Sequence, residues 1–266
     1  MTGMRFLVLS TGSKGNCTYV ATGHSQVLID CGIGIRFLES ALAAHGIDWH
    51  GIDAVFATHM HSDHVGGIPT LLKHVPARVY AHQLMAPDLG LMIRRELSCA
   101  KRAKYTDFEL TAFNGGDGFY HRDLDVLPVP VSHDCNPTVM YKLHHNGGWA
   151  GVLTDLGTTT DHLVETFGNC DALLLEANHC PQLLADGPYP PMLKQRIRGN
   201  YGHLSNRQAA EFATGLARMP RHLFLGHLSD ENNTPAAASA AFNRVETGAI
   251  PHTVLPQRTT GGLVEL

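Results

Sequence analysis

The sequence predicts an α/β fold in which buried strands alternate with helices in a single domain. Short apolar runs rich in Val, Ile, Leu and Phe recur along the chain, and such runs are typical of strands buried inside a sheet. Segments with helical spacing of apolar residues lie between them. A chain of 266 residues with 44% hydrophobic content can bury one large core. No Pro/Ser-rich or highly charged linker divides it, so we expect one domain over residues 1–266.

Six of the apolar runs end directly on an aspartate or a histidine. In an α/β layered fold, residues at strand ends converge on one edge of the sheets, where catalytic groups are commonly found. One such ending means little, but six of them predict a shared site. The residues that follow the six runs are Asp30, His59, His133, Asp155, His179 and His227.

The densest of these strand ends is the stretch from Thr58 to Gly67, which reads T-H-M-H-S-D-H-V-G-G. Imidazole and carboxylate groups are ligands for Zn and other borderline divalent metals. His59 and His61 lie two apart at a strand end, so their side chains leave the same face. Asp63 and His64 follow where the chain turns into a helix, so they should point to a neighbouring position. We predict a site for two metal ions rather than a polar turn that is rich in His by chance.

This H-x-H-x-D-H stretch resembles motif 2 of the metallo-β-lactamase superfamily, whose members carry a dinuclear metal site. The resemblance implies an αββα sandwich of two mixed β-sheets flanked by helices. It also implies roles for the residues at the strand ends. His59, His61 and His133 would hold one metal, Asp63, His64 and His227 the other, and Asp155 would bridge them, while Asp30 would orient the metal loop without binding a metal.

Three further stretches resemble the YycJ (WalJ) exonucleases, a group related to ribonuclease J. They are G-S-x-G-N-x-T-Y at 12–19, E-x-N-H at 176–179 and L-x-H-L-S-x-E-N-N at 225–233. In the first, Ser13 lies in a Gly- and Asn-rich loop. This loop either directs its backbone N–H groups at an anion or is a plain hairpin turn. In the second, His179 is either an outer group of the metal site or a structural histidine. The likeness runs from Ser10 to Pro235.

His203 lies two residues before a predicted helix N-cap, because Ser205 and Gln208 form a capping box. Free N–H groups and the helix dipole favour anions at such a position. Basic residues precede it, and a comparable G-H-x-S stretch in the ribonuclease J and YycJ groups carries a histidine that contacts the substrate phosphate. We therefore predict that His203, with Ser13 and Arg198, contacts a phosphate; the alternative is a histidine that braces the helix start.

Other segments carry weaker signals. Ile35, Leu38 and Leu42 lie on one helical face that ends near Gly46, and Thr234-Pro235 opens a last helix. Asn146-Gly147 predicts a hairpin turn with His144 and His145 at the surface. The segment Leu89–Lys104 predicts a helix that is either a solvated face or a track for a polyanion. Its basic residues are Arg94, Arg95, Lys101, Arg102 and Lys104.

The net charge of −4 does not indicate a nucleic-acid binder, although two bound cations would make the site locally positive. The six cysteines include no C-x-x-C pair, which is typical of reduced thiols in the cytoplasm. We expect no signal peptide and no membrane span.

The resemblance implies a 5′→3′ exonuclease that acts on DNA and is linked to DNA repair, with DNA favoured over RNA. Two divalent ions (Zn, Mn or Fe) about 3.5–4 Å apart would activate a water between them for attack on phosphorus. Asp63 would take its proton and His203 would bind a phosphate oxygen. A small-molecule metallohydrolase, acting on a cyclic phosphodiester, thioester or lactone, is the alternative that the acidic net charge favours. A non-catalytic binding module is a weaker reading, because a decayed site would have lost some of these ligands.

Overall fold

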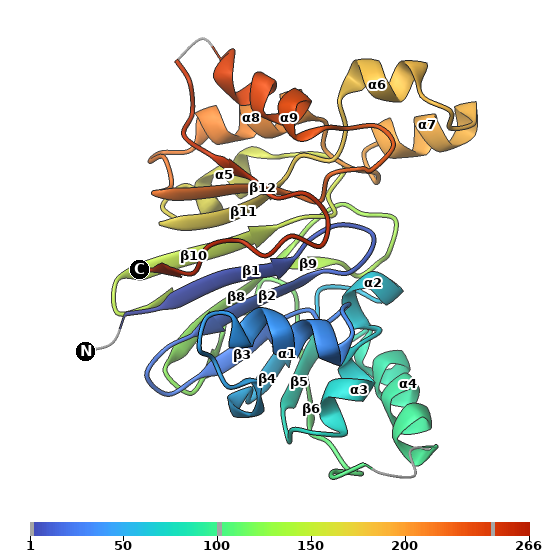
Figure 1. The fold of residues 1–266 in the computed structure, drawn as a ribbon, viewed down its shortest axis with the longest axis vertical. Helices are drawn as coiled ribbons and strands as arrows, with labels where there is room; N and C mark the ends of the chain where they lie inside the picture. Colours follow the sequence, from blue (N-terminus) through green and yellow to red (C-terminus); the bar gives the residue numbers. More distant parts are fainter. Residues whose placement is uncertain (1–2, 100–102, 246–247) are drawn as a thin grey trace.

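The computed structural model describes residues 3–99, 103–245 and 248–266. Two seven-stranded β-sheets dominate these residues (Figure 1). In order across the first sheet, the strands are β14 (Val264–Glu265), β1 (Arg5–Ser10), β2 (Cys17–Ala21), β3 (Gln26–Ile29), β4 (Ala54–Phe56), β5 (Arg78–His82) and β6 (Leu110–Phe113). Across the second sheet they are β13 (Thr253–Val254), β12 (His222–Gly226), β11 (Ala172–Glu176), β10 (Gly148–Leu153), β9 (Val139–His145), β8 (Leu124–Pro130) and β7 (Phe119–His121).

Both sheets are mixed in the same way. The strands from β14 to β3 pair antiparallel, and those from β3 to β6 pair parallel. In the second sheet, β13 to β10 pair parallel and β10 to β7 antiparallel. Because parallel strands end at the same edge of a sheet, the predicted site residues after β3, β4, β10 and β12 emerge on common edges.

Helices cover the outer face of each sheet, one layer below and one above the sheets in Figure 1. The lower layer holds α1 (Ile35–Ala43), the short 3-10 helix η1 (Trp49–Gly51), α2 (Ser62–Val65), α3 (Ile68–Leu72) and α4 (Ala86–Ser98). The upper layer holds α5 (Asp161–Phe167), α8 (Asn206–Gly215) and α9 (Pro235–Asn243), and beside it project α6 (Pro181–Asp186) and α7 (Pro191–Arg198).

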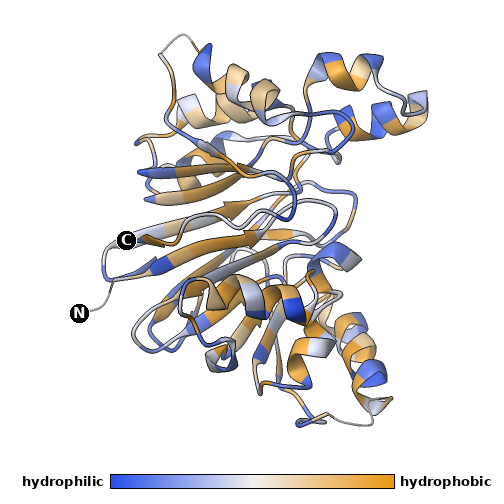
Figure 2. Ribbon diagram, viewed as in Figure 1, coloured by the Kyte–Doolittle hydropathy of each residue, from blue (hydrophilic) through white to orange (hydrophobic). Residues whose placement is uncertain are grey.

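Three apolar layers hold this arrangement together, and Figure 2 shows the strands as largely hydrophobic. Leu38 of α1 and Ile93 of α4 belong to the layer under the first sheet. Phe56 and Tyr141 belong to the layer between the sheets, and Phe212 of α8 to the layer above the second sheet. The helix–sheet–sheet–helix order confirms the predicted αββα sandwich. Among the described residues, no helix has the length and apolar character needed to cross a membrane.

Local sequence signals at several turns and caps are confirmed. Ser205 and Gln208 form the capping box of α8, and Thr234 caps α9 with Pro235 in the first turn. Asn146 and Gly147 have φ of 47° and 84° and connect β9 to β10, as a type I′ turn requires.

Two expectations are wrong. His145 is buried, and its Nδ1 lies 2.9 Å from the carbonyl oxygen of Asp123. The helix predicted over Leu89–Lys104 instead spans Ala86–Ser98, so Arg94 and Arg95 lie on it. Lys104 lies in a following loop whose N–H donates to the carbonyl of Lys73, an interaction that continuing the helix would have excluded. Lys101 and Arg102 lie outside the described residues.

Candidate metal centre

The site is built at strand ends where the backbone turns sharply. Asp30 and His227 directly follow β3 and β12, and Asp155 lies two residues after the end of β10; they have φ of 59°, 55° and 54°. Non-glycine residues rarely adopt this left-handed conformation, although Asp and His do so more readily than most. Such strain, of order 1 kcal/mol or more per residue, persists only where the surrounding structure holds it. Here it turns each side chain out of the strand and into the site.

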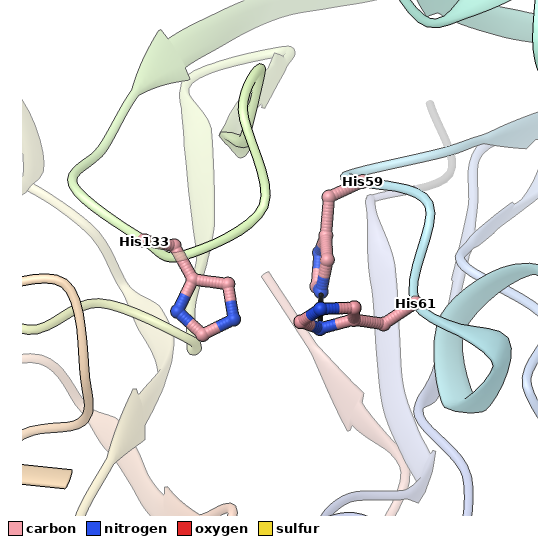
Figure 3. Close-up of side chains that lie close together, drawn as sticks. All are labelled: His59, His61 and His133. Atoms are coloured by element: carbon pink, nitrogen blue, oxygen red, sulfur yellow. Dashed lines mark hydrogen bonds between the residues drawn. The ribbon is translucent and has the colours of Figure 1, made fainter. Parts of the chain in front are cut away.

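The first group of ligand-type side chains is His59, His61 and His133, whose nitrogens lie within 4.8 Å of one another. His59 and His61 extend from the loop after β4, and His133 faces them from the loop after β8 (Figure 3). The His59 Nε2 and His61 Nδ1 atoms are 3.0 Å apart. Two nitrogens bound to one tetrahedral Zn would be roughly 3.3 Å apart, so this spacing suits one shared ion.

The second group is Asp63, His64 and His227. Asp155 lies between the two groups, and one of its oxygens is 3.2 Å from His64 Nε2 while the other is 3.2 Å from His227 Nε2. Both of these histidines belong to the second group; in the first group, His133 Nε2 is 3.9 Å from Asp155 Oδ1. The structure thus brings all seven sequence-predicted ligands together, with Asp155 between the two groups.

Four of the histidines share one orientation, in which Nδ1 is held by the protein and Nε2 faces inward. His64 Nδ1 lies 2.7 Å from Asp30 Oδ2, and His59 Nδ1 lies 2.9 Å from Thr58 Oγ1. His133 Nδ1 donates to a backbone carbonyl, and His227 Nδ1 is 3.0 Å from a buried glutamate oxygen. Metal-binding histidines are generally oriented by such contacts. Asp30 therefore lies on the Nδ1 side of His64, and Asp155 lies on its Nε2 side.

Buried polar atoms without partners test whether this cluster fits metal ions. Seven such atoms lie in the described residues, and three of them, His133 Nε2, Asp155 Oδ2 and His227 Nε2, belong to the cluster. A buried polar atom without a partner costs free energy, and a bound cation would remove that cost. Five imidazoles and two carboxylates suit a divalent ion such as Zn or Mn. The residues present fit divalent metal ions.

The protonation states of His59 and His64 agree with a cluster that binds metal ions. Burial, then the charge of His64, hold the pKa of His59 well below its ordinary value, so His59 is in the neutral form that binds metals. Burial opposes a charge on His64 too, but Asp30 and Asp155 raise its pKa well above the ordinary value. In the metal-free protein His64 is therefore positively charged. Binding of a metal ion to its Nε2 would displace the proton from that nitrogen and release it.

The loop after β4 is locked to two neighbouring loops by backbone contacts. The N–H of Asn16 donates to the carbonyl of Asp63 at 2.7 Å, and the N–H of Cys31 to that of His64 at 2.8 Å. Gly32 lies so close to this loop that an added Cβ would be 1.6 Å from the Asp63 carbonyl oxygen. Any larger residue at 32 would push the metal loop outward, which explains a glycine there.

Glu176 is a central residue of the site that the sequence analysis quoted but gave no role. Its carboxylate is fully buried at the end of β11 and is approached by five N–H donors. The Nδ1 atoms of His203 and His227 lie 2.8 Å and 3.0 Å from Oε1. The other donors are the backbone N–H groups of Asp155, Leu156 and Leu204. An acidic residue closing an apolar strand, as in Leu173-Leu174-Leu175-Glu176, was the signal that could have identified it.

The pair of Glu176 and His203 is charged. Burial alone would raise the pKa of Glu176, but His203 and His227 hold it at about 2. Burial would likewise lower the pKa of His203, but Glu176, and more weakly Asp155, raise it to about 9. At neutral pH in the metal-free protein His203 is therefore an imidazolium. Its Nδ1–H is used by Glu176, so its Nε2–H remains available to a ligand.

A cavity of about 210 Å³ opens beside the cluster and is bounded by His203, His227 and α7. Leu193, Arg196 and Ile197 form the α7 wall, and Tyr189 precedes it. Arg196 donates from Nε and Nη2 to Asp134 Oδ2. The other oxygen of Asp134 is 3.3 Å from His133 Nε2. This ion pair ties α7 to the metal centre, and the sequence analysis missed Asp134.

The other predicted site residues, Ser13, Arg198 and His179, lie in three different surroundings. Ser13 lines the cavity. Arg198 does not line it: it lies with Lys194 on a separate surface hollow, because the helical repeat of α7 turns Leu193, Arg196 and Ile197 inward instead. His179 forms no side-chain hydrogen bond within the described residues, and burial holds its pKa at about 4. In the segment 176–179, Glu176 and Asn178 reach His227 instead.

Comparison with known proteins identifies the family to which this fold and site belong. Residues 25–228 match the family described as "Beta-lactamase superfamily domain". The chain is 29% identical over 244 residues to exodeoxyribonuclease YycJ of Bacillus anthracis, covering 91% of this chain and 89% of that protein. It is 31% identical over 236 residues to exodeoxyribonuclease WalJ of Streptococcus pneumoniae, covering 87% and 84%. The metallo-β-lactamase fold protein YhfI from Bacillus subtilis superposes with a TM-score of 0.70 at 17% identity, over 97% of this chain and 99% of that one.

The last match concerns the fold alone, whereas the first three cover most of the sequence and include the metal loop. The predicted resemblance is confirmed. The chain belongs to the β-lactamase superfamily, as a metal-dependent hydrolase of the metallo-β-lactamase fold that is related to the YycJ and WalJ exodeoxyribonucleases.

Proposed function

We propose that this protein is a 5′→3′ exodeoxyribonuclease that hydrolyses the terminal phosphodiester bond of a DNA strand. The observation that carries this proposal is the cavity beside the metal cluster, which is lined by His203 and bounded on one side by α7. The two relatives that match most of the chain are both named exodeoxyribonucleases, which favours DNA over RNA. The resemblance to that group extends the proposal to DNA repair in the cytoplasm.

In this proposal His59, His61 and His133 hold one metal ion, and Asp63, His64 and His227 hold the other, with Asp155 between them. Divalent ions at such a site lower the pKa of water towards neutrality and offset the negative charge of a phosphate. The orientation of the imidazoles by Asp30, Thr58 and Glu176 sets these ligands in place before substrate arrives.

Two side chains would act on the reacting groups. Asp63 is the less buried carboxylate, with 24% of its side chain exposed against 3% for Asp155, and it would accept the proton of the attacking water. His203 would donate its Nε2–H to a non-bridging phosphate oxygen and stabilise the charge that develops there. Glu176 keeps His203 charged and holds its ring in position.

The shape of the cavity supports cleavage at an end. Helix α7 forms one wall of the cavity, and the Arg196–Asp134 ion pair holds this wall against the metal centre. A strand end could enter this cavity, which has a volume of about 210 Å³. The half-buried Tyr189, Leu193 and Ile197 offer an apolar surface to a terminal base or sugar.

A digestion series tests the proposal. End-labelled single- and double-stranded DNA and RNA, with and without a 5′-phosphate, would be incubated with enzyme that has been treated with a chelator and reloaded with Mn or Zn. We expect stepwise shortening of DNA from the 5′ end, and no digestion by an Asp63→Ala/His64→Ala variant. Intact polymers, alongside metal-dependent cleavage of a small ester, would contradict the exonuclease proposal.

Replacement of His203 by alanine should lower turnover of a DNA strand about 10²–10³-fold, because one charged donor to the transition state is lost. Both metals should remain bound, since His203 is not a proposed ligand. Turnover would be measured together with metal content, and His162→Ala, on the exposed face of α5, is the matched control. Loss of metal from the His203 variant would count against its role as a phosphate contact.

A small-molecule metallohydrolase is the second candidate. The small volume of the cavity and the net charge of −4 favour it. A cyclic phosphodiester, thioester or lactone could contact the same cluster, and the protein would then need no extended surface to bind a polymer. The small ester in the digestion series distinguishes this candidate from the first.

A further inference from the structure

A second cavity lies on the other side of the loop that carries Ser13. It has a volume of about 450 Å³ and is lined by Ser10, Lys14, Ile33, Gly34, Ile35, Arg36, Phe37 and Arg258. These residues come from the loop after β1, the start of α1 and the segment before β14. We call this cavity the Arg36 groove.

The charge of the Arg36 groove is entirely positive. Lys14, Arg36 and Arg258 line it, and no carboxylate does. Lys14 is paired with Asp230, but Arg36 and Arg258 are exposed and form no salt bridge within the described residues. Some other arginines are paired, as Arg78 is with Glu109 and Arg196 with Asp134. A wall with three cations in a chain of net charge −4 suits an anionic ligand.

The groove also has an apolar side. Ile35 and Phe37 are half-buried and pack against the core under the first sheet, so their outer faces are presented to the groove with little freedom to move. Proteins that bind single-stranded nucleic acid combine cations that follow the phosphates with apolar or aromatic side chains that contact the bases. Arg36 and Phe37 are consecutive residues and supply both kinds of contact.

The groove lies beside the cavity at the metal centre, across the loop that carries Ser13 and Lys14. Ser13 lines the cavity beside His203 and His227, and its neighbour Lys14 lines the Arg36 groove. The same loop donates from the N–H of Asn16 to the carbonyl of Asp63, so it forms the rim between the two cavities. A ligand that leaves the metal centre over this rim would enter the groove.

We propose that the Arg36 groove binds the part of a single-stranded DNA substrate that extends beyond the cleaved phosphate, with Arg36 and Arg258 contacting its phosphates and Phe37 contacting a base. This inference rests on the proposed exonuclease function and adds the path of the strand. In this path the 5′ end of the DNA strand lies in the cavity beside α7. The rest of the strand crosses the Ser13–Lys14 rim into the groove.

Steady-state kinetics with a metal-loaded Arg36→Ala/Arg258→Ala variant tests the path. For a 5′-phosphorylated 20-nucleotide DNA strand, we expect KM to rise at least about 10-fold and the salt dependence of log kcat/KM to weaken by about 1.4, since each phosphate contact in single strands contributes roughly 0.7. Cleavage of a 5′-phosphorylated dinucleotide and of bis(p-nitrophenyl) phosphate should change less than twofold, because neither reaches the groove.

The matched control is Arg207→Ala/Arg244→Ala, which removes two exposed arginines at α8 and at the end of α9 and should leave the KM of the long strand unchanged. An unchanged KM in the Arg36/Arg258 variant, or an equal loss in the Arg207/Arg244 variant, would overturn the proposed path. Thermal melting would verify that both variants fold. Wild-type protein that leaves DNA intact would overturn the proposed function itself, whereas DNA digestion that is indifferent to Arg36 and Arg258 would overturn the groove alone.

Discussion

Replacement of Asp155 by asparagine should lower hydrolysis of any substrate by at least about 10³-fold, because it removes the buried negative charge that lies between the two groups of ligand-type side chains. Each oxygen of Asp155 is 3.2 Å from one imidazole nitrogen, of His64 or of His227. An asparagine of the same shape offers one oxygen and no charge, so it can satisfy only one of these positions. We expect the variant to retain less metal than the wild type after desalting, as measured by elemental analysis.

Thermal melting separates loss of metal from loss of fold. Added Mn or Zn should stabilise the wild type, by about 2.7 kcal/mol at 100 times the dissociation constant, and should stabilise Asp155→Asn much less. The matched control is Asp117→Asn, in an exposed turn, which should behave as the wild type. Full metal occupancy with wild-type activity in Asp155→Asn would contradict a bridging role.

Replacement of Glu176 by glutamine should lower activity or metal affinity about 10–100-fold, although Glu176 is not a proposed ligand. All five groups that approach its carboxylate are N–H donors. The amide NH₂ of glutamine must face at least one of them, so a buried donor is left unpaired. The ring of His227 or of His203 then loses the contact that turns its Nε2 towards the site. Kinetics and metal content would be measured beside Glu165→Gln, an exposed glutamate on α5.

The same substitution should change how stability depends on pH. The pKa of Glu176 is lowered from its ordinary value of 4.5 to about 2 in the folded protein. A lowered carboxyl pKa stabilises the fold above the unfolded value, and this stabilisation is lost as pH falls from 4.5 towards 2. Metal-free Glu176→Gln should therefore lose less stability than the metal-free wild type across this interval in urea unfolding. Equal losses in the two proteins would show that Glu176 is not held as a carboxylate by its neighbours.

The sequence alone determined the layered fold and the ligand-type residues of the centre. Both follow from short-range chemistry, because an apolar run ending on His or Asp reports a buried strand and the group at its end. The capping box at Ser205 placed His203 at a helix start for the same reason. The H-x-H-x-D-H spacing then connected these strand ends to one family, and the match to residues 25–228 confirmed it.

Only the tertiary structure decided how these groups are oriented and what supports them. Glu176 collects donors from residues 155–156, 203–204 and 227, segments that are far apart in sequence and meet because β10, β11 and β12 end at one edge. The strained backbone of Asp30, Asp155 and His227, and the choice of Arg196 over Arg198 for the cavity wall, likewise depend on neighbouring elements. Periodicity and capping report contacts within a few residues, whereas these features arise from sheet topology, which brings distant loops together and leaves no local pattern in the chain.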